Sequence, residues 1–281
     1  MPSVIEIGLR VQHWPSLPPT ARQTHAAACD ALETHGGSPS RFSLWPLQQR
    51  DDDGSLLRLR IGWLPDTTPP PASTQVGRRW RFGSLVADVE TADLTQTPYS
   101  ELAAHEPARS IRLTFLTPTY FKQSESGAPT RYFPLPDPNR VFRGLIERWN
   151  AFANWQGIDE RVRSELLAAI EISDLDIRAE RMLKDRPGGP NGKESFILGF
   201  VGAVEFTLSP DAPVQSARAF GAIGAFAAFT GVGHGTTRGF GACETRVMRS
   251  GAREPNAHAP HGHQAGASTS QHPARVRGVH R

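Results

Sequence analysis

The residues best suited to contact a ligand form a glycine-rich segment near the C-terminal end, Thr230-Gly-Val-Gly-His-Gly-Thr-Thr-Arg-Gly-Phe-Gly241. Glycines at this density allow a backbone to turn tightly or to lie close to a ligand. Two common phosphate-binding loops do not fit the segment. The dinucleotide fingerprint needs a glycine where Thr236 stands, and it should follow a strand, whereas this segment follows an Ala-rich helical pattern. The Walker A loop needs Gly-Lys-Ser or Gly-Lys-Thr, and the Gly192-Lys193 pair is followed by Glu194.

Two explanations of this segment remain. Its backbone N–H groups, its two threonine hydroxyls and Arg238 could hold the phosphates of a polynucleotide. Alternatively, the glycines only allow a helix to connect closely to a strand. Composition does not decide between a phosphate site and a packing role.

The distribution of charge limits how an anion could be bound. The whole chain has a net charge of +3, but residues 249–281 contribute +4, so the remainder sums to −1. An anion-binding surface on the folded part must therefore come from local clusters of arginine. The lysines are Lys122, Lys184 and Lys193, which leaves few positions for a catalytic lysine.

Several classes of protein are excluded by composition. No stretch approaches the roughly 18–20 consecutive apolar residues of a transmembrane helix. Residues 1–10 alternate polar and apolar side chains, which is unlike the pattern of a signal peptide. We therefore expect a cytoplasmic protein. Cys29 and Cys243 form no CxxC pair and no disulfide framework, so we expect two ordinary buried or half-buried thiols.

The pattern of apolar residues predicts the same order of elements twice. In the first half, strands are expected at 3–11, 41–47, 55–64 and 79–90, with a hairpin turn at 51–54, a helix over 20–34 and a weak helix at 73–77. In the second half, strands are expected at 110–117, 172–181, 194–208 and 239–248, with helices from 137, over 159–170 and over 214–229. This β-α-β-β-α-β order is that of a split βαβ unit.

We therefore predict an α+β fold of two tandem ferredoxin-like (RRM-like) domains, residues 1–105 and 106–248. Residues 249–281 have no periodicity and are predicted to be a disordered tail. Three histidines of the tail could hold a divalent metal weakly, but no rigid scaffold orients them, so no metal site is predicted: His258, His261 and His263.

Several motifs resemble one known family. Gly199-Phe-Val-Gly-Ala-Val-Glu205, followed by a helix and the glycine-rich segment, resembles the C-terminal signature of the CRISPR repeat-processing endoribonucleases of the RAMP superfamily. Arg112-Leu-Thr-Phe-Leu-Thr-Pro-Thr-Tyr-Phe121 resembles the central strand and turn of that family, and Leu135-Pro-Asp-Pro138 resembles the start of its next helix. Thr34-His35-Gly-Gly-Ser-Pro-Ser-Arg-Phe-Ser-Leu44 resembles, more loosely, the segment that carries the usual catalytic histidine.

The resemblance implies an endoribonuclease that needs no metal or other cofactor. In this family the upstream 2′-hydroxyl attacks the phosphate and leaves a 2′,3′-cyclic phosphate and a 5′-hydroxyl. His35 is then the catalytic candidate, because histidine exchanges protons near neutral pH, and Arg41 is the cation that stabilises the phosphate. His25 is the alternative catalytic histidine, and His35 could instead be a solvated histidine at a helix end. The predicted RNA contacts are Gly231, Gly233, His234, Gly235, Thr236, Thr237, Arg238, Gly239 and Gly241.

One departure from the family keeps a second function open. The family often uses a tyrosine in its first helix, but the tyrosines here are Tyr99, Tyr120 and Tyr132. The alternative is a non-catalytic RAMP-type RNA-binding subunit of a CRISPR effector complex. Under either function the expected partners are CRISPR repeat RNA or mature crRNA and other effector subunits, with no membrane. A monomer and a homodimer are both consistent with the sequence.

Overall fold

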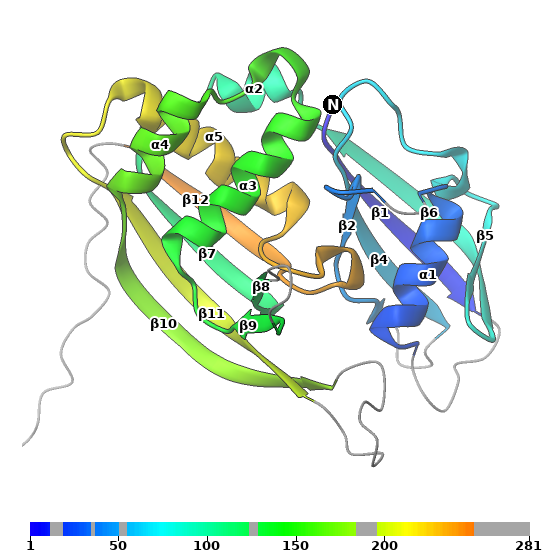
Figure 1. The fold of residues 1–281 in the computed structure, drawn as a ribbon. Helices are drawn as coiled ribbons and strands as arrows, with labels where there is room; N and C mark the ends of the chain where they lie inside the picture. Colours follow the sequence, from blue (N-terminus) through cyan, green and yellow to red (C-terminus); the bar gives the residue numbers. More distant parts are fainter. Residues whose placement is uncertain (12–18, 35–36, 51–54, 124–128, 184–195, 250–281) are drawn as a thin grey trace, which may run out of the picture. The chain divides into compact units, whose positions relative to one another are not determined.

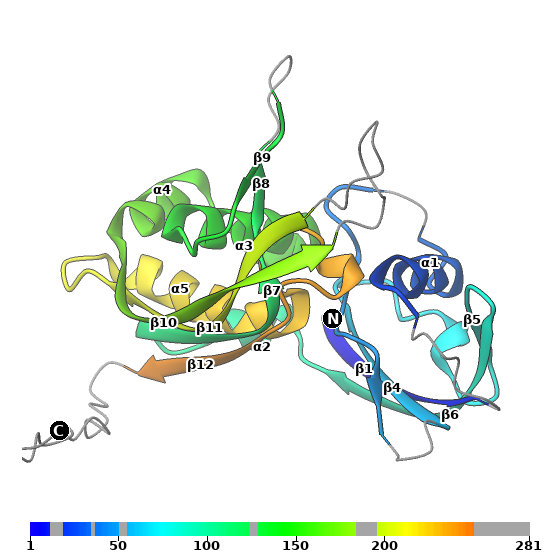
Figure 2. The same cartoon turned by 90° about the horizontal axis from the view of Figure 1, so that it is seen from below.

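The computed structural model describes residues 1–11, 19–34, 37–50, 55–123, 129–183 and 196–249. The predicted turn at 51–54 and the predicted tail lie outside the described residues, apart from Arg249. Met1–Ser250 form one compact unit. Within it, two antiparallel sheets are each covered by helices on one face, which gives an α+β fold (Figures 1 and 2).

The first sheet has the strand order β2-β4-β1-β6-β5, and β3 pairs with β4. Its strands are β1 (Ser3–Val11), β2 (Phe42–Leu44), β3 (Gln48–Gln49), β4 (Leu56–Trp63), β5 (Arg79–Phe82) and β6 (Leu85–Gln96). Helix α1 (Ala21–Ala31) covers one face. It begins at a capping box, in which Thr20 and Gln23 each bond the other's backbone N–H, and it buries Thr24, Ala27 and Ala28.

Two predictions for the first half were wrong. The strand predicted at 79–90 is a hairpin, because Gly83, with φ of +68°, and Ser84 form a two-residue turn between Phe82 and Leu85. The weak helix predicted at 73–77 is only a short 3-10 turn, η1 (Ala72–Thr74), within a proline-rich connection. Helix α2 (Tyr99–Ala103) follows β6 instead.

The second sheet has the order β10-β11-β7-β12, and all neighbouring strands are antiparallel. Its strands are β7 (Ala108–Thr119), β10 (Ile170–Leu183), β11 (Phe196–Leu208) and β12 (Cys243–Arg249), and a separate small hairpin is formed by β8 (Phe121–Gln123) and β9 (Arg131–Phe133). The helices on this sheet are α3 (Pro138–Phe152), α4 (Glu160–Ala169) and α5 (Val214–Thr230), and two further 3-10 turns are η2 (Asn154–Gln156) and η3 (Thr236–Arg238). Figure 1 shows β10 and β11 as a long curved hairpin.

Helix α3 is the element that brings charged residues to the candidate site. Asp137 caps its N-terminus by accepting the Arg140 N–H at 2.8 Å, and Pro138 occupies the first turn. Its apolar face is buried as the sequence predicts: Val141, Phe142, Leu145, Ile146 and Trp149. The polar face, which carries Arg140 and Arg143, is therefore held outward.

The two halves of the chain share part of their core. Besides one apolar cluster under each sheet, a third cluster joins Leu64 and Tyr99 to Trp149 and Phe226. Ser43 of β2 donates a hydrogen bond to the carbonyl of Phe229 at 2.6 Å, which adds a polar link at the end of α5. These contacts fix the first half against the helix that leads into the glycine-rich segment.

Both cysteines are free thiols, as the sequence predicts. Cys29 is half-buried and Cys243 is buried. Burial raises the pKa of Cys243 to about 12, so its thiol is protonated at neutral pH. No helix among the described residues is long and apolar enough to cross a membrane.

Candidate functional site

The glycine-rich loop, residues 231–241, turns from α5 into β12 through a backbone that needs glycine. Five of its glycines have φ between +63° and +85°: Gly231, Gly233, Gly235, Gly239 and Gly241. At Gly241 an added Cβ would lie 1.8 Å from the carbonyl oxygen of Val232, which no side chain could tolerate. The strand predicted from 239 therefore begins only at Cys243, after the end of the loop.

Backbone N–H groups of the loop donate hydrogen bonds to carbonyl groups of the loop itself and of the segment 118–120. Val232 donates to Gly241 at 2.8 Å, His234 donates to Tyr120 at 2.8 Å, and Gly241 donates to Pro118 at 3.2 Å. The 3-10 turn η3 is closed by a bond from the Arg238 N–H to the Gly235 carbonyl at 2.8 Å. These bonds tie the backbone of the loop to the rest of the fold.

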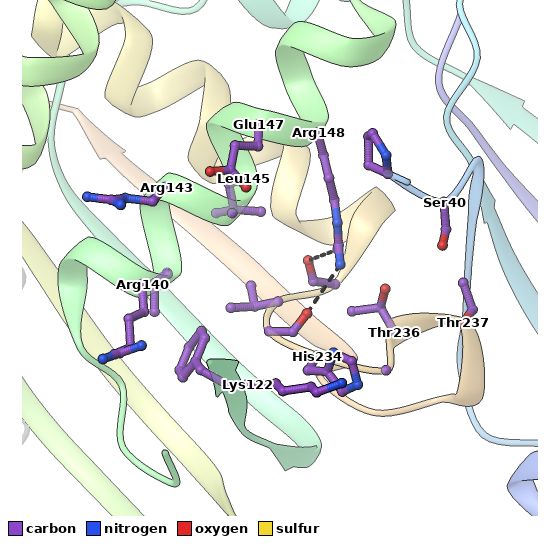
Figure 3. A pocket seen from close by; sticks show the side chains of 18 of the residues that line it. Ser40, Lys122, Arg140, Arg143, Leu145, Glu147, Arg148, His234, Thr236 and Thr237 are labelled. Atoms are coloured by element: carbon purple, nitrogen blue, oxygen red, sulfur yellow. Dashed lines mark hydrogen bonds between the residues drawn. The ribbon is translucent and has the colours of Figure 1, made fainter. Parts of the chain in front are cut away.

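Arg148 of α3 holds the start of the loop. Its Nη1 donates to the carbonyl oxygen and hydroxyl of Thr230 at 3.0 and 2.9 Å and to the Gly231 carbonyl at 3.3 Å, while Nη2 donates to the Gly233 carbonyl at 3.2 Å. Figure 3 shows Arg148 reaching from α3 to the loop. Burial lowers the pKa of Arg148 to about 10, and the nearby Glu147 carboxylate partly offsets this effect. The guanidinium is therefore still cationic at neutral pH.

A cleft of about 660 Å³ lies beside the loop. Its walls come from the segment 38–40, from β8, from the polar face of α3 and from residues 231–238 of the loop. Of the described residues, five cationic side chains and the carboxylate of Glu147 line the cleft. The five cations are Lys122, Arg140, Arg143, Arg148 and Arg238. Figure 3 shows Lys122 and His234 on the loop side and Arg140 and Arg143 along α3. Such a cleft attracts anions.

Neighbouring residues orient the cations at the edge of the cleft. Arg140 lies over the ring of Phe133 at 3.7 Å and donates to Gln123 at 3.2 Å. Arg238 donates to the hydroxyl of Tyr120 at 3.1 Å. Both guanidinium groups are therefore held by the protein while they line the cleft.

Among the described residues, His234 is the histidine that lines the cleft. Partial burial lowers its pKa to about 4, and the positive charges of Arg238, Lys122 and Arg148 act in the same direction. His234 is therefore neutral at pH 7 in the free protein. An anion bound among these cations would offset their effect and raise the pKa again.

The structure brings together only part of the predicted site. Seven of the predicted RNA contacts line the cleft: Gly231, Gly233, His234, Gly235, Thr236, Thr237 and Arg238. The other two do not, because Gly239 lies against Pro46 and Gly241 against Val232. Arg41 is exposed and is not among the residues that line the cleft. His35 lies outside the described residues, but Ser38, Pro39 and Ser40, which follow it in the sequence, form one wall.

Sequence reasoning missed the cations from other elements, which are Lys122, Arg140, Arg143 and Arg148. One signal was available, because Arg140, Arg143 and Glu147 recur at helical spacing beside the apolar face of α3. Lys122 is not part of any such pattern. Among the described residues, no group of three His, Cys, Asp or Glu side chains comes together as a metal-binding set.

Two helix-covered antiparallel sheets with a basic cleft and a rigid glycine-rich loop define an α+β protein suited to bind a polyanion. Residues 113–243 match the family model of the CRISPR-associated endoribonuclease Cas6, so this part of the chain carries the sequence pattern of that family. The resemblance to CRISPR repeat-processing endoribonucleases that the motifs indicated is thereby confirmed.

Curated relatives agree with the family match. The Cas6 endoribonucleases of two Mycobacterium tuberculosis strains, CDC 1551 and H37Rv, are each 28% identical over 176 residues, which is 61% of this chain and 51% of the relative. The chain thus spans about half the length of the curated relatives it matches.

Solved structures support the fold. A Cas6 product complex matches with a TM-score of 0.70 at 22% identity, covering 88% of this chain and 100% of the other. Thermus thermophilus Cas6 matches with a TM-score of 0.62 at 24% identity, covering 88% of this chain and 98% of the other.

Proposed function

We propose that this protein is an endoribonuclease that cuts CRISPR repeat RNA into mature crRNA without a metal ion. The observation that carries the proposal is the basic cleft, in which the glycine-rich loop faces the segment 38–40. That segment begins three residues after His35, the histidine that the family resemblance marks as catalytic. The cations that bind phosphates and the histidine that transfers a proton would then act on the same stretch of RNA.

In the proposed reaction the 2′-hydroxyl oxygen forms a bond to the adjacent phosphorus, and the bond from phosphorus to the 5′-oxygen breaks. The proton of the 2′-hydroxyl is released and the 5′-oxygen gains one, so the products are a 2′,3′-cyclic phosphate and a 5′-hydroxyl. His35 would carry out one of these proton transfers. Arg41 and the cleft cations would stabilise the charge that builds on the phosphorane.

We also propose that the chain consists of two tandem ferredoxin-like domains, residues 1–105 and 106–248. Support comes from the strand orders, since β2-β4-β1-β6 and β10-β11-β7-β12 are both the order of a split βαβ unit. The second helix of the first unit is replaced by η1. RNA would bind where the two domains meet, at the loop that joins α5 to β12 and whose turn η3 lies against β2.

A second candidate function is an RNA-binding subunit without catalysis. It is favoured by the composition of α1, which contains no tyrosine, and by Arg41, which does not line the cleft. In that case repeat RNA would occupy the same cations and would not be cut. Other effector subunits would then supply the activity of the complex.

One assay separates these functions. The full chain is incubated with repeat RNA in excess EDTA, with an unrelated hairpin RNA of equal length as the control, and the ends of the products are analysed. We expect cutting of the repeat RNA and a 2′,3′-cyclic phosphate end. Binding without cutting would support the subunit, and no binding would contradict both functions.

The cleft cations also predict a strong salt dependence. If three to five of them contact phosphates, the affinity for RNA should fall roughly 20- to 500-fold between 50 and 200 mM salt. Arg238→Ala should reduce the slope of log Kd against log salt by about one. Arg218→Ala, which changes an exposed arginine of α5 outside the cleft, is the matched control and should leave the slope unchanged. An affinity independent of salt would show that the cleft does not bind phosphates.

A further inference from the structure

His25 of α1 contacts the glycine-rich loop from the first half of the chain. Its Nδ1 lies 2.9 Å from the carbonyl oxygen of Thr237, in the turn η3. A carbonyl only accepts hydrogen bonds, so Nδ1 carries the proton of this bond. His25 is not among the residues that line the cleft.

The other ring nitrogen and the face of the imidazole also contact protein side chains. Nε2 lies 3.6 Å from Sγ of Cys29, and the ring stacks on Phe42 of β2 with centroids 6.2 Å apart and planes 22° apart. Both ring nitrogens thus face protein atoms. This arrangement suits a residue that holds other residues in place, and it does not suit a residue that exchanges protons with a substrate.

The position of this contact in the fold gives it a role. Two of the loop's other anchors, Tyr120 and Arg148, come from the second half of the chain. The bond from His25 instead joins the loop to α1, the helix that ends at Ala31 just before the segment 35–41. Gly239 of the loop also packs on Pro46, beyond β2.

We propose that His25 is a positioning residue, a latch that holds the turn η3 of the glycine-rich loop against α1 and so keeps the loop beside the segment 38–40, which lines the same cleft. The consequence for function rests on the proposed cleavage of RNA. RNA would still bind to the cleft cations without the latch, but its phosphate would be held less well against the group that transfers the proton. His25 then affects the rate at saturating RNA more than it affects the affinity.

Two substitutions test the latch. His25→Phe keeps a ring to stack on Phe42 and removes the donor, whereas His25→Asn places an amide N–H close to the position of Nδ1. We expect His25→Phe to lower the single-turnover rate at saturating RNA about fivefold and to change Kd less than twofold. His25→Asn should recover most of that rate. His105→Phe, at an exposed histidine outside the cleft, is the control.

A second measurement does not depend on RNA. Hydrogen exchange of the amides of residues 238–241 in the free protein should be faster in His25→Phe and close to wild type in His25→Asn. A loss of rate in His25→Asn of 100-fold or more would overturn the latch, because it would make His25 a catalytic residue. Unchanged exchange in His25→Phe would overturn it as well. If the wild-type protein neither binds nor cuts RNA, the proposed function fails, and the exchange measurement still decides whether the latch exists.

Discussion

Replacing His35 by alanine should lower the single-turnover rate of repeat cleavage by at least 100-fold. Proton transfer by a positioned side chain contributes roughly 10²- to 10⁴-fold to a reaction rate, and this reaction must move two protons. The affinity for RNA should stay within about threefold of wild type, because the cleft cations that attract phosphates are unchanged. The measurement is a pair of experiments on the same variant, a cleavage time course at saturating RNA and a binding titration.

The control for this prediction is His105→Ala, which changes an exposed histidine outside the cleft and should cut at the wild-type rate. Arg41→Ala should have a smaller effect than His35→Ala, since Arg41 does not line the cleft and five other cations do. Wild-type cleavage by His35→Ala would remove His35 from the mechanism. Loss of binding together with cleavage would mean that the substitution disturbs the cleft itself.

The elements of the fold with strong periodicity were predictable from the sequence. Residues 3–11 alternate because every second side chain of β1 is buried, and the apolar residues of α3 recur at helical spacing because one face is buried. The C-terminal part of β6 could not be predicted in this way. Residues 90–96 are exposed and mostly polar, and they form a strand only because they pair with β1.

The candidate site was only half predictable for a physical reason. The glycine-rich loop is a local signal, since its backbone conformation requires glycine at fixed positions. The opposite wall is made by Lys122 and the arginines of α3, about 90 to 110 residues earlier in the chain. Nothing in the sequence near these cations marks them as neighbours of the loop, because the fold alone brings α3 and β8 against it.

Arg148→Ala should have the largest effect on stability of any change in the cleft. The substitution leaves the carbonyl groups of Thr230, Gly231 and Gly233 without the donor that the guanidinium supplies. Losing hydrogen bonds to a half-buried charged group costs roughly 2–4 kcal/mol in the free energy of unfolding. For a chain of this size that corresponds to a decrease in Tm of about 5–15 °C. Thermal unfolding followed by circular dichroism measures it.

Arg148→Ala should also weaken RNA binding, because Arg148 fixes the loop whose residues line the cleft. We expect the affinity for RNA to fall about tenfold or more, and hydrogen exchange of residues 231–235 to become faster. Arg148→Lys keeps the charge but offers a single ammonium group, which cannot reach all four acceptors in the geometry of the guanidinium. It should therefore recover only part of the stability.

Arg143→Ala is the matched comparison, since Arg143 is an exposed arginine on the same helix that lines the same cleft. It should weaken RNA binding through the loss of one positive charge and leave Tm within about 2 °C of wild type. Arg143→Ala thus measures the loss of one positive charge, and Arg148→Ala measures in addition the loss of the hydrogen bonds that hold the loop. Equal unfolding temperatures for Arg148→Ala and Arg143→Ala, with unchanged exchange in the loop, would show that Arg148 contributes only its charge.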